Sequence, residues 1–149
     1  FRLFAAWRLQ HLGLWGKYSM ERENMRIIDA KALGGVGGPR VPLRQAYVDM
    51  ANRLPATLDE GVNEVYLSHG SKPETIVAIL GGGLNERFSG GLFGNGTYLA
   101  EDVAKNDQYC TPDVRHGAHP DLHQLLFDNP GLTHPGGLYY VFFCRALLG

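Results

Sequence analysis

The stretch that decides the fold runs from residue 63 to residue 71 and reads NEVYLSHGS. Residues 62–68 are rich in β-branched and aromatic side chains, which predicts a strand. A helix is expected directly afterwards, because Ser71 and Glu74 have the spacing of a capping box and Pro73 is tolerated in a first turn. A histidine, a glycine and a serine therefore stand where a strand passes into a helix.

A second stretch repeats this organisation. Residues 91–102 read GLFGNGTYLAED, at the end of a glycine-studded segment, 84–96, that predicts a loop. Residues 97–99 are expected to form a short strand, and Asp102 can cap a helix that runs to about Tyr109. Strand, turn and helix are thus predicted twice in succession.

Periodicity and chain breakers predict the remaining elements. These are a strand over 1–10, helices over 14–32, 43–53 and 122–127, a glycine stop at 81–83, loops over 34–39 and 111–137, and a buried strand over 138–148. No repeat, heptad or low-complexity tract interrupts this order. We therefore expect a single α+β domain over residues 1–149.

Composition limits the function. The 149 residues carry 14 Lys and Arg against 15 Asp and Glu, with a pI near 6.6, so there is no general cationic field for nucleic acid. The strongest apolar run, 138–144, is far shorter than the roughly 20 residues that span a bilayer. Two cysteines make no disulfide framework and favour a reduced, intracellular chain.

Three other patterns in the sequence bear on alternative functions. Four histidines near Cys110 suggest zinc, and His119 and His123 have i,i+4 spacing, but the segment is proline-broken and lacks CxxC and HExxH. We expect surface-loop histidines and no metal. Neither a P-loop nor a Rossmann pattern is present, and His69 with Ser71 does not form a GxSxG nucleophile motif.

The two stretches 63–71 and 91–102, with Tyr109 seven residues further on, together resemble the catalytic domain of the poly(ADP-ribose) polymerase family. The resemblance extends to residues 14–18 and 141–149 and therefore covers nearly the whole chain. It implies the ADP-ribosyltransferase fold, an α+β arrangement of two packed, mainly antiparallel sheets with flanking helices. Members of this family use NAD as an ADP-ribose donor.

The resemblance also assigns roles to residues. His69 is expected to hydrogen-bond the adenosine-side ribose of NAD, and Ser71 could reach the same ribose while capping its helix. The Gly70 backbone is expected to hold the nicotinamide carboxamide, because a glycine lets the ligand approach the main chain. Tyr98 and Tyr109 match the aromatic residues that flank the nicotinamide ring. Of these residues, His69 and Tyr98 are the expected catalytic pair.

Three further positions complete the expected site. Asn106 stands where many members place a serine that bonds the carboxamide, and an amide can both donate and accept. Arg87, in the loop over the donor site, is expected at the pyrophosphate. No residue matches the glutamate of the family's third motif, and Glu101 should not take its place. That motif and its C-terminal strand are expected beyond residue 149.

The expected activity is transfer of ADP-ribose from NAD to a protein or another macromolecule, with release of nicotinamide. The alternative is a catalytically inactive module that binds NAD or ADP-ribose, or a protein partner. NAD and a protein acceptor are the expected partners, without direct DNA contact and without a membrane. The nucleus or the cytoplasm is the expected compartment.

Overall fold

A computed structural model describes residues 2–32, 45–54, 56–85, 90–91 and 94–149. In chain order the elements are α1 (Leu12–Ala32), α2 (Gln45–Ala51), the 3₁₀ turn η1 (Glu60–Val62), β1 (Glu64–Ser71), α3 (Pro73–Gly82), β2 (Gly90–Gly91), β3 (Gly94–Asn95), the 3₁₀ helix η3 (Val103–Tyr109), α4 (Pro120–His123), the π-helical turn η4 (Gln124–Asp128) and β4 (Tyr140–Leu147). Helices and antiparallel strands are mixed along the chain, which confirms the expected α+β class.

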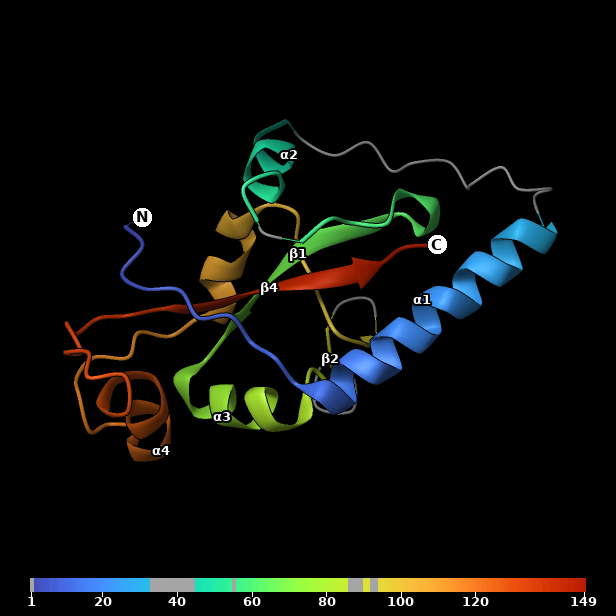
Figure 1. The fold of residues 1–149 in the computed structure, drawn as a ribbon. Coiled ribbons are helices and arrows are strands. Elements are labelled where there is room, and N and C mark those ends of the chain that lie inside the picture. Colours follow the sequence, from blue (N-terminus) through green and yellow to red (C-terminus); the bar gives the residue numbers. More distant parts are fainter. Residues whose placement is uncertain (1, 33–44, 55, 86–89, 92–93) are drawn as a thin grey trace.

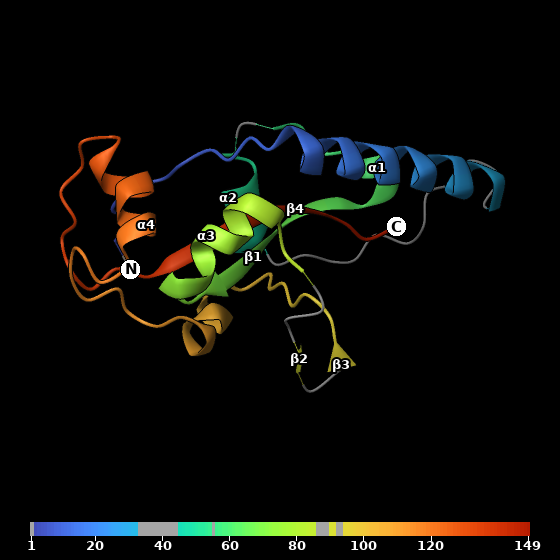
Figure 2. The same cartoon turned by 90° about the horizontal axis from the view of Figure 1, so that it is seen from below.

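Two long antiparallel strands, β1 and β4, form the centre of the molecule (Figure 1). Their register places Ser71 opposite Tyr140 and His69 opposite Phe142. The second pair, β2 with β3, is a small hairpin. In Figure 2, α1 and this hairpin lie on opposite sides of the central strands. In the described residues each antiparallel sheet therefore has two strands.

The N-terminal segment does not form the strand predicted for residues 1–10. Residues 2–11 are irregular, and residue 1 lies outside the described residues. The rings of Phe4 and Trp7 both approach the ring of Phe127, at centroid distances of 6.4 and 6.1 Å. Alternation would place these two side chains on opposite faces, so the sequence pattern was misleading. A strand needs a neighbouring strand that hydrogen-bonds its backbone groups. This segment instead packs through its side chains.

Helix α1 confirms the predicted helix and begins two residues earlier than expected. The ring Nδ1 of His11 accepts a hydrogen bond from the Leu14 N–H at 3.2 Å, and the His11 carbonyl accepts from Trp15. A histidine therefore satisfies a free N–H at this helix start, which is a capping role outside the usual Ser, Thr, Asp and Asn signals.

A buried carboxylate fastens α1 to the central strands. Arg145 on β4 donates two hydrogen bonds to Glu64 on β1, each 2.7 Å long, and the Tyr18 hydroxyl donates a third at 2.5 Å. The Glu64 side chain has no solvent exposure. Burial works to raise the pKa of Glu64, but the hydrogen bonds from Arg145 and Tyr18 outweigh it and lower that pKa. The glutamate is therefore held ionised.

The start of α3 corrects the predicted capping box. Ser71 is still part of β1, and Lys72 occupies the N-cap without a side-chain hydrogen bond, followed by Pro73 at the first helical position. The strand β1 extends three residues past the predicted end at residue 68, so Ser71 pairs with Tyr140 in the sheet and does not cap the helix. The glycine stop is confirmed, because Gly83 adopts a positive φ of 80° directly after the helix.

Other elements differ mainly at their ends. The helix predicted over 43–53 is α2, and residues 43 and 44, like the whole predicted loop over 34–39, lie outside the described residues. The helix predicted over 122–127 is formed by α4 and η4. The strand predicted over 138–148 is β4.

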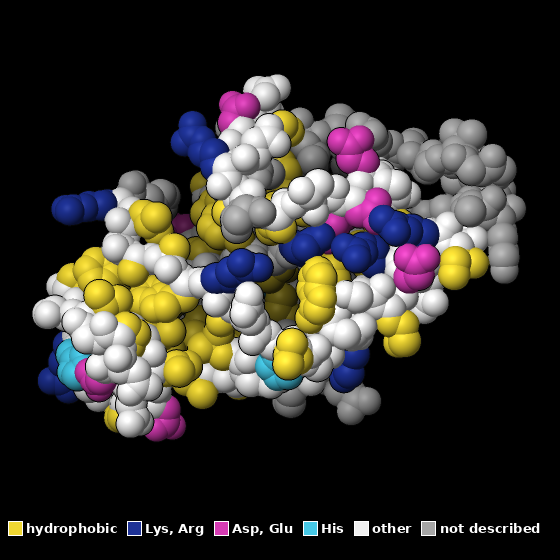
Figure 3. Space-filling view, viewed as in Figure 1, with side chains coloured by type: hydrophobic (Ala, Val, Ile, Leu, Met, Phe, Trp, Pro, Cys, Tyr) yellow, Lys and Arg dark blue, Asp and Glu magenta, His cyan; other side chains and the backbone are white. Residues whose placement is uncertain are grey.

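Apolar side chains from distant segments form two clusters around the central strands. One contains Ile76, Leu122, Leu126, Phe127 and Tyr140, and the other contains Tyr47, Val65 and Tyr66. On the left of Figure 3, apolar side chains gather over the region where the N-terminal segment and α4 lie in Figure 1. No helix in the described part of the chain has the length and hydrophobicity needed to cross a bilayer.

Candidate NAD donor site

His69 and Tyr98 are joined by a hydrogen bond, although 29 positions separate them in the sequence. The Nδ1 atom of His69 lies 2.9 Å from the Tyr98 carbonyl oxygen. A carbonyl can only accept, so Nδ1 carries the proton. In the neutral ring, Nε2 then has the lone pair and can accept a hydrogen bond from a ligand hydroxyl. The two expected catalytic residues therefore lie at one place.

Tyr98 packs against the β2–β3 hairpin. Its hydroxyl donates to the Gly94 carbonyl at 2.8 Å, and a Cβ at Gly91 would come within 2.7 Å of the tyrosine ring. The strand predicted over 97–99 does not form. A single antiparallel bridge joins Ala100 to Ser68, with both backbone hydrogen bonds at 2.8 Å. One bridge is enough to fix the Tyr98 carbonyl beside His69.

Gly70 is in close contact with the 3₁₀ helix η3. A Cβ on this glycine would lie 2.7 Å from both the Asn106 Cβ and the Cys110 Sγ, and 2.9 Å from the Asn106 backbone oxygen. Ordinary carbon contacts are about 3.5–4.0 Å. Glycine is therefore required for packing at this position, and Cys110 is a neighbour that sequence reasoning did not place here.

Asn106, on η3, is buried against β1 and uses both ends of its side-chain amide. Its Oδ1 accepts the Gly70 N–H at 3.1 Å, and its Nδ2 donates to the Ser68 hydroxyl at 2.8 Å. Ser68 in turn donates to the Ala100 carbonyl at 2.7 Å. The Asp102 side chain caps η3 by accepting the Ala104 N–H at 3.0 Å, as the sequence predicted. Ser68 was missed because its contacts join residues about 30 positions apart.

The remaining expected site residues are Ser71, Tyr109 and Arg87. Ser71 is buried at the end of β1, next to Gly70, and does not cap α3. Tyr109 ends η3 and is 55% exposed. Arg87 lies outside the described residues. The structure thus brings together His69, Gly70, Tyr98 and Asn106.

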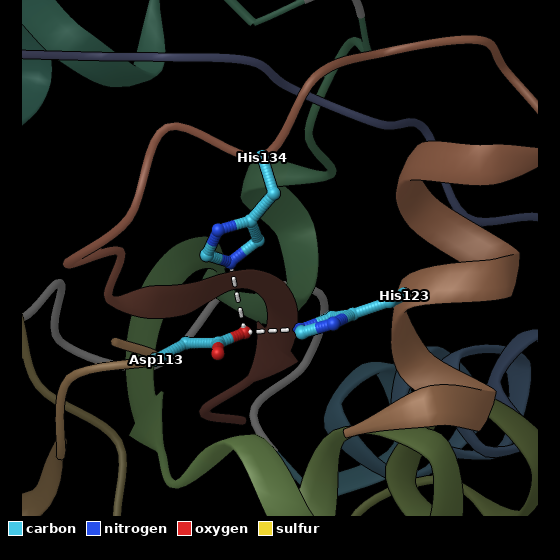
Figure 4. A group of neighbouring side chains, drawn as sticks. All are labelled: Asp113, His123 and His134. Atoms are coloured by element: carbon cyan, nitrogen blue, oxygen red, sulfur yellow. Dashed lines mark hydrogen bonds and ion pairs between the residues drawn. The ribbon is translucent and has the colours of Figure 1, made fainter. Parts of the chain in front are cut away.

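A second group of polar side chains surrounds Asp113 (Figure 4). One carboxylate oxygen of Asp113 accepts from the Tyr140 hydroxyl at 2.6 Å and from His123 Nε2 at 2.7 Å, and His134 Nε2 lies 3.2 Å away. These carboxyl and imidazole groups are at most 1% exposed. The expectation of surface-loop histidines is therefore wrong for His123 and His134, while His116 is exposed and pairs with Asp128 at 2.9 Å.

The residue types around Asp113 would suit a divalent transition metal. The hydrogen bonds at the Nδ1 atoms of His123 and His134, however, are not those of metal ligands. Nδ1 of His123 accepts the Gly117 N–H at 2.7 Å, and Nδ1 of His134 accepts the Gly136 N–H at 3.0 Å. Both neutral rings therefore carry their proton on Nε2, facing Asp113. A metal-binding imidazole needs a lone pair on that atom and normally donates from the other nitrogen. The geometry is that of a hydrogen-bonded carboxylate.

Comparison with known proteins decides the family. The model of the poly(ADP-ribose) polymerase catalytic domain matches residues 1–149. The chain belongs to this family. Two similar relatives are the protein mono-ADP-ribosyltransferases PARP11 of mouse and of human, each 35% identical over 91 residues, which is 59% of this chain. Those residues make up only 27% and 26% of the two relatives, so the chain spans about a quarter of their length.

Membership of the poly(ADP-ribose) polymerase family confirms the resemblance drawn from residues 63–71 and 91–102. These are the segments that carry His69, Gly70 and Tyr98, which the structure places at one end of β1. In this family member, the position next to the Gly70 N–H is filled by the amide of Asn106.

Proposed function

We propose that this chain is the NAD-binding part of an ADP-ribosyltransferase that moves ADP-ribose from NAD to a protein acceptor and releases nicotinamide. The observation that carries the proposal is the hydrogen bond from His69 Nδ1 to the Tyr98 carbonyl. It leaves Nε2 as an acceptor for a ribose hydroxyl, while neighbouring Gly70 lets a ligand approach the main chain. The family match supports the same reaction.

In the proposed reaction NAD is a substrate that supplies its own leaving group. The glycosidic bond to nicotinamide breaks with its electron pair going to the positively charged ring, and the acceptor nucleophile bonds to the same sugar carbon and loses a proton. The protein contributes positioning: His69 and Ser71 at the adenosine-side ribose, the Gly70 backbone at the carboxamide with Asn106 beside it, and Tyr98 and Tyr109 beside the nicotinamide ring. Arg87 is proposed at the pyrophosphate.

We propose that no metal takes part. The support is chemical, because the imidazoles nearest to a candidate ligand set, His123 and His134, have their Nδ1 atoms occupied by backbone N–H donors. A nicotinamide leaving group that departs as a neutral ring also needs no Lewis acid. Activity that survives prolonged treatment with a strong chelator is the expected result.

The test follows nicotinamide release and protein-bound ADP-ribose in the full-length protein. His69→Ala should lower nicotinamide release about tenfold or more, since it removes the acceptor for the ribose and the link to Tyr98. His116→Ala, an exposed histidine outside this site, is the matched control and should keep wild-type release. NAD binding without any nicotinamide release by folded wild-type protein would favour the inactive binding module instead.

A further inference from the structure

The amide of Asn106 presents a carboxamide group to a main-chain donor inside the proposed donor site. Its orientation is fixed by its neighbours. The Gly70 N–H can only donate, so it faces Oδ1, and the Ser68 hydroxyl, whose proton goes to the Ala100 carbonyl, accepts from Nδ2. With 4% exposure, the residue has little room for another arrangement without outward movement.

Strand alternation shows which way the Gly70 backbone points. Two residues earlier, the Ser68 N–H and carbonyl both bond Ala100, on the side of β1 away from β4. Backbone groups two residues apart on a strand point the same way, so the Gly70 carbonyl points toward the same side as its N–H. Together they offer one donor and one acceptor to a planar amide, and Asn106 occupies the donor.

We propose that Asn106 is a built-in competitor of the nicotinamide carboxamide and so determines how tightly this site holds NAD. This inference rests on the proposed function. Asn106 and the nicotinamide of NAD carry the same primary amide, and the Gly70 N–H has one proton to give. The ligand carbonyl therefore takes that proton only when the Asn106 side chain releases it, which weakens binding by the strength of the lost hydrogen bond.

Two substitutions at this position test the proposal in opposite directions. Asn106→Ala removes the competing oxygen without adding a hydrogen-bonding group, and nicotinamide and NAD should bind about fivefold more tightly, the factor that corresponds to a hydrogen bond of about 1 kcal/mol. Asn106→Asp keeps the shape and holds the Gly70 N–H with a charged acceptor, so nicotinamide should bind at least about fivefold more weakly. Calorimetry on the full-length protein measures both affinities.

ADP-ribose is the control ligand, because it has every part of NAD except the nicotinamide. Its affinity should stay within about twofold in both variants. Wild-type protein that binds neither ADP-ribose nor NAD would refute the proposed function. If wild-type protein binds both ligands, an alanine variant that binds nicotinamide no more tightly, or an aspartate variant that binds it no more weakly, would overturn the competition and leave the proposed function intact.

A measurement on wild-type protein covers the case in which a variant fails to fold. During a nicotinamide titration followed by ¹⁵N NMR, the Gly70 backbone amide and the Asn106 side-chain amide should shift together with one affinity. A shift of the Gly70 signal with no change at the Asn106 amide would overturn the proposal, because the ligand would then have taken the N–H without displacing anything.

Discussion

Substituting Gly70 by alanine tests whether β1 and η3 are in contact as closely as the structure shows. The new Cβ would lie 2.7 Å from the Asn106 Cβ and from the Cys110 Sγ, so each contact is about 0.8 Å shorter than an ordinary carbon contact. Side chains can move, but the Asn106 backbone oxygen at 2.9 Å can move only with η3 itself. Overpacking of this kind costs about 1–3 kcal/mol.

Urea unfolding with and without NAD measures the effect of Gly70→Ala on stability and on NAD binding. Gly70→Ala should lower the free energy of unfolding by about 1–3 kcal/mol and weaken NAD binding, because η3 carries Tyr109, which is proposed beside the nicotinamide ring. Gly16→Ala is the matched control: nothing lies within 4 Å of its new Cβ, and the position is inside α1. It should raise stability by about 0.5–1 kcal/mol.

A double variant shows which neighbour resists the alanine. Cys110→Ala, combined with Gly70→Ala, removes the sulfur contact and should recover only part of the lost stability, since the Asn106 backbone oxygen stays in place. An alanine at position 70 that leaves both stability and NAD affinity at wild-type values would refute the close contact between β1 and η3.

Two further predictions concern the buried carboxylates. Arg145→Met should lower the free energy of unfolding by about 3–5 kcal/mol, because it leaves Glu64 buried without its main partner; a loss below 1 kcal/mol in urea unfolding would contradict this. Burial works to raise the pKa of Asp113, but hydrogen bonds from Tyr140 and His123 outweigh it and lower that pKa. A carboxyl group whose pKa is lower in the folded state stabilises the protein at pH values above its ordinary pKa near 4. This stabilisation is lost as the pH falls through the folded-state pKa. The difference in unfolding free energy between wild type and Asp113→Asn should therefore shrink below about pH 4, and a constant difference down to pH 2 would contradict the assignment.

The elements that the sequence predicted well are those encoded locally. The helix α1 and the strands β1 and β4 have periodic or continuous apolar patterns of their own, so their type follows without knowledge of the partner. The segments 1–10 and 97–99 have strand-like patterns, but a strand also needs a ladder of backbone hydrogen bonds. Among the described residues neither segment forms one, and a single bridge at Ala100 follows the second segment.

In the candidate site, too, the local sequence identified the motif residues but not the contacts between distant segments. The motif residues His69, Gly70 and Tyr98 were found because their local sequences are distinctive. The partners of Asn106 were not, since a polar side chain gives no local sign that it will meet Ser68 and the Gly70 N–H. The burial of His123 was missed for the same reason: its polarity and the nearby prolines suggest a surface loop, and its hydrogen bonds to Asp113 and to the Gly117 N–H explain its place in the interior.

The hydrogen bond from Tyr140 to Asp113 also has a consequence for strand alignment. Sliding β4 by two residues against β1 would keep every side chain on its own face, so hydrophobic alternation cannot distinguish that error from the native pairing. The native alignment places Tyr140 opposite Ser71 and its hydroxyl on Asp113, whose backbone pairs with Leu138. A slipped strand would leave a buried carboxylate without this donor. The hydrogen bond to Asp113 thus stabilises the native alignment of β4 with the end of β1, which carries His69 and Gly70.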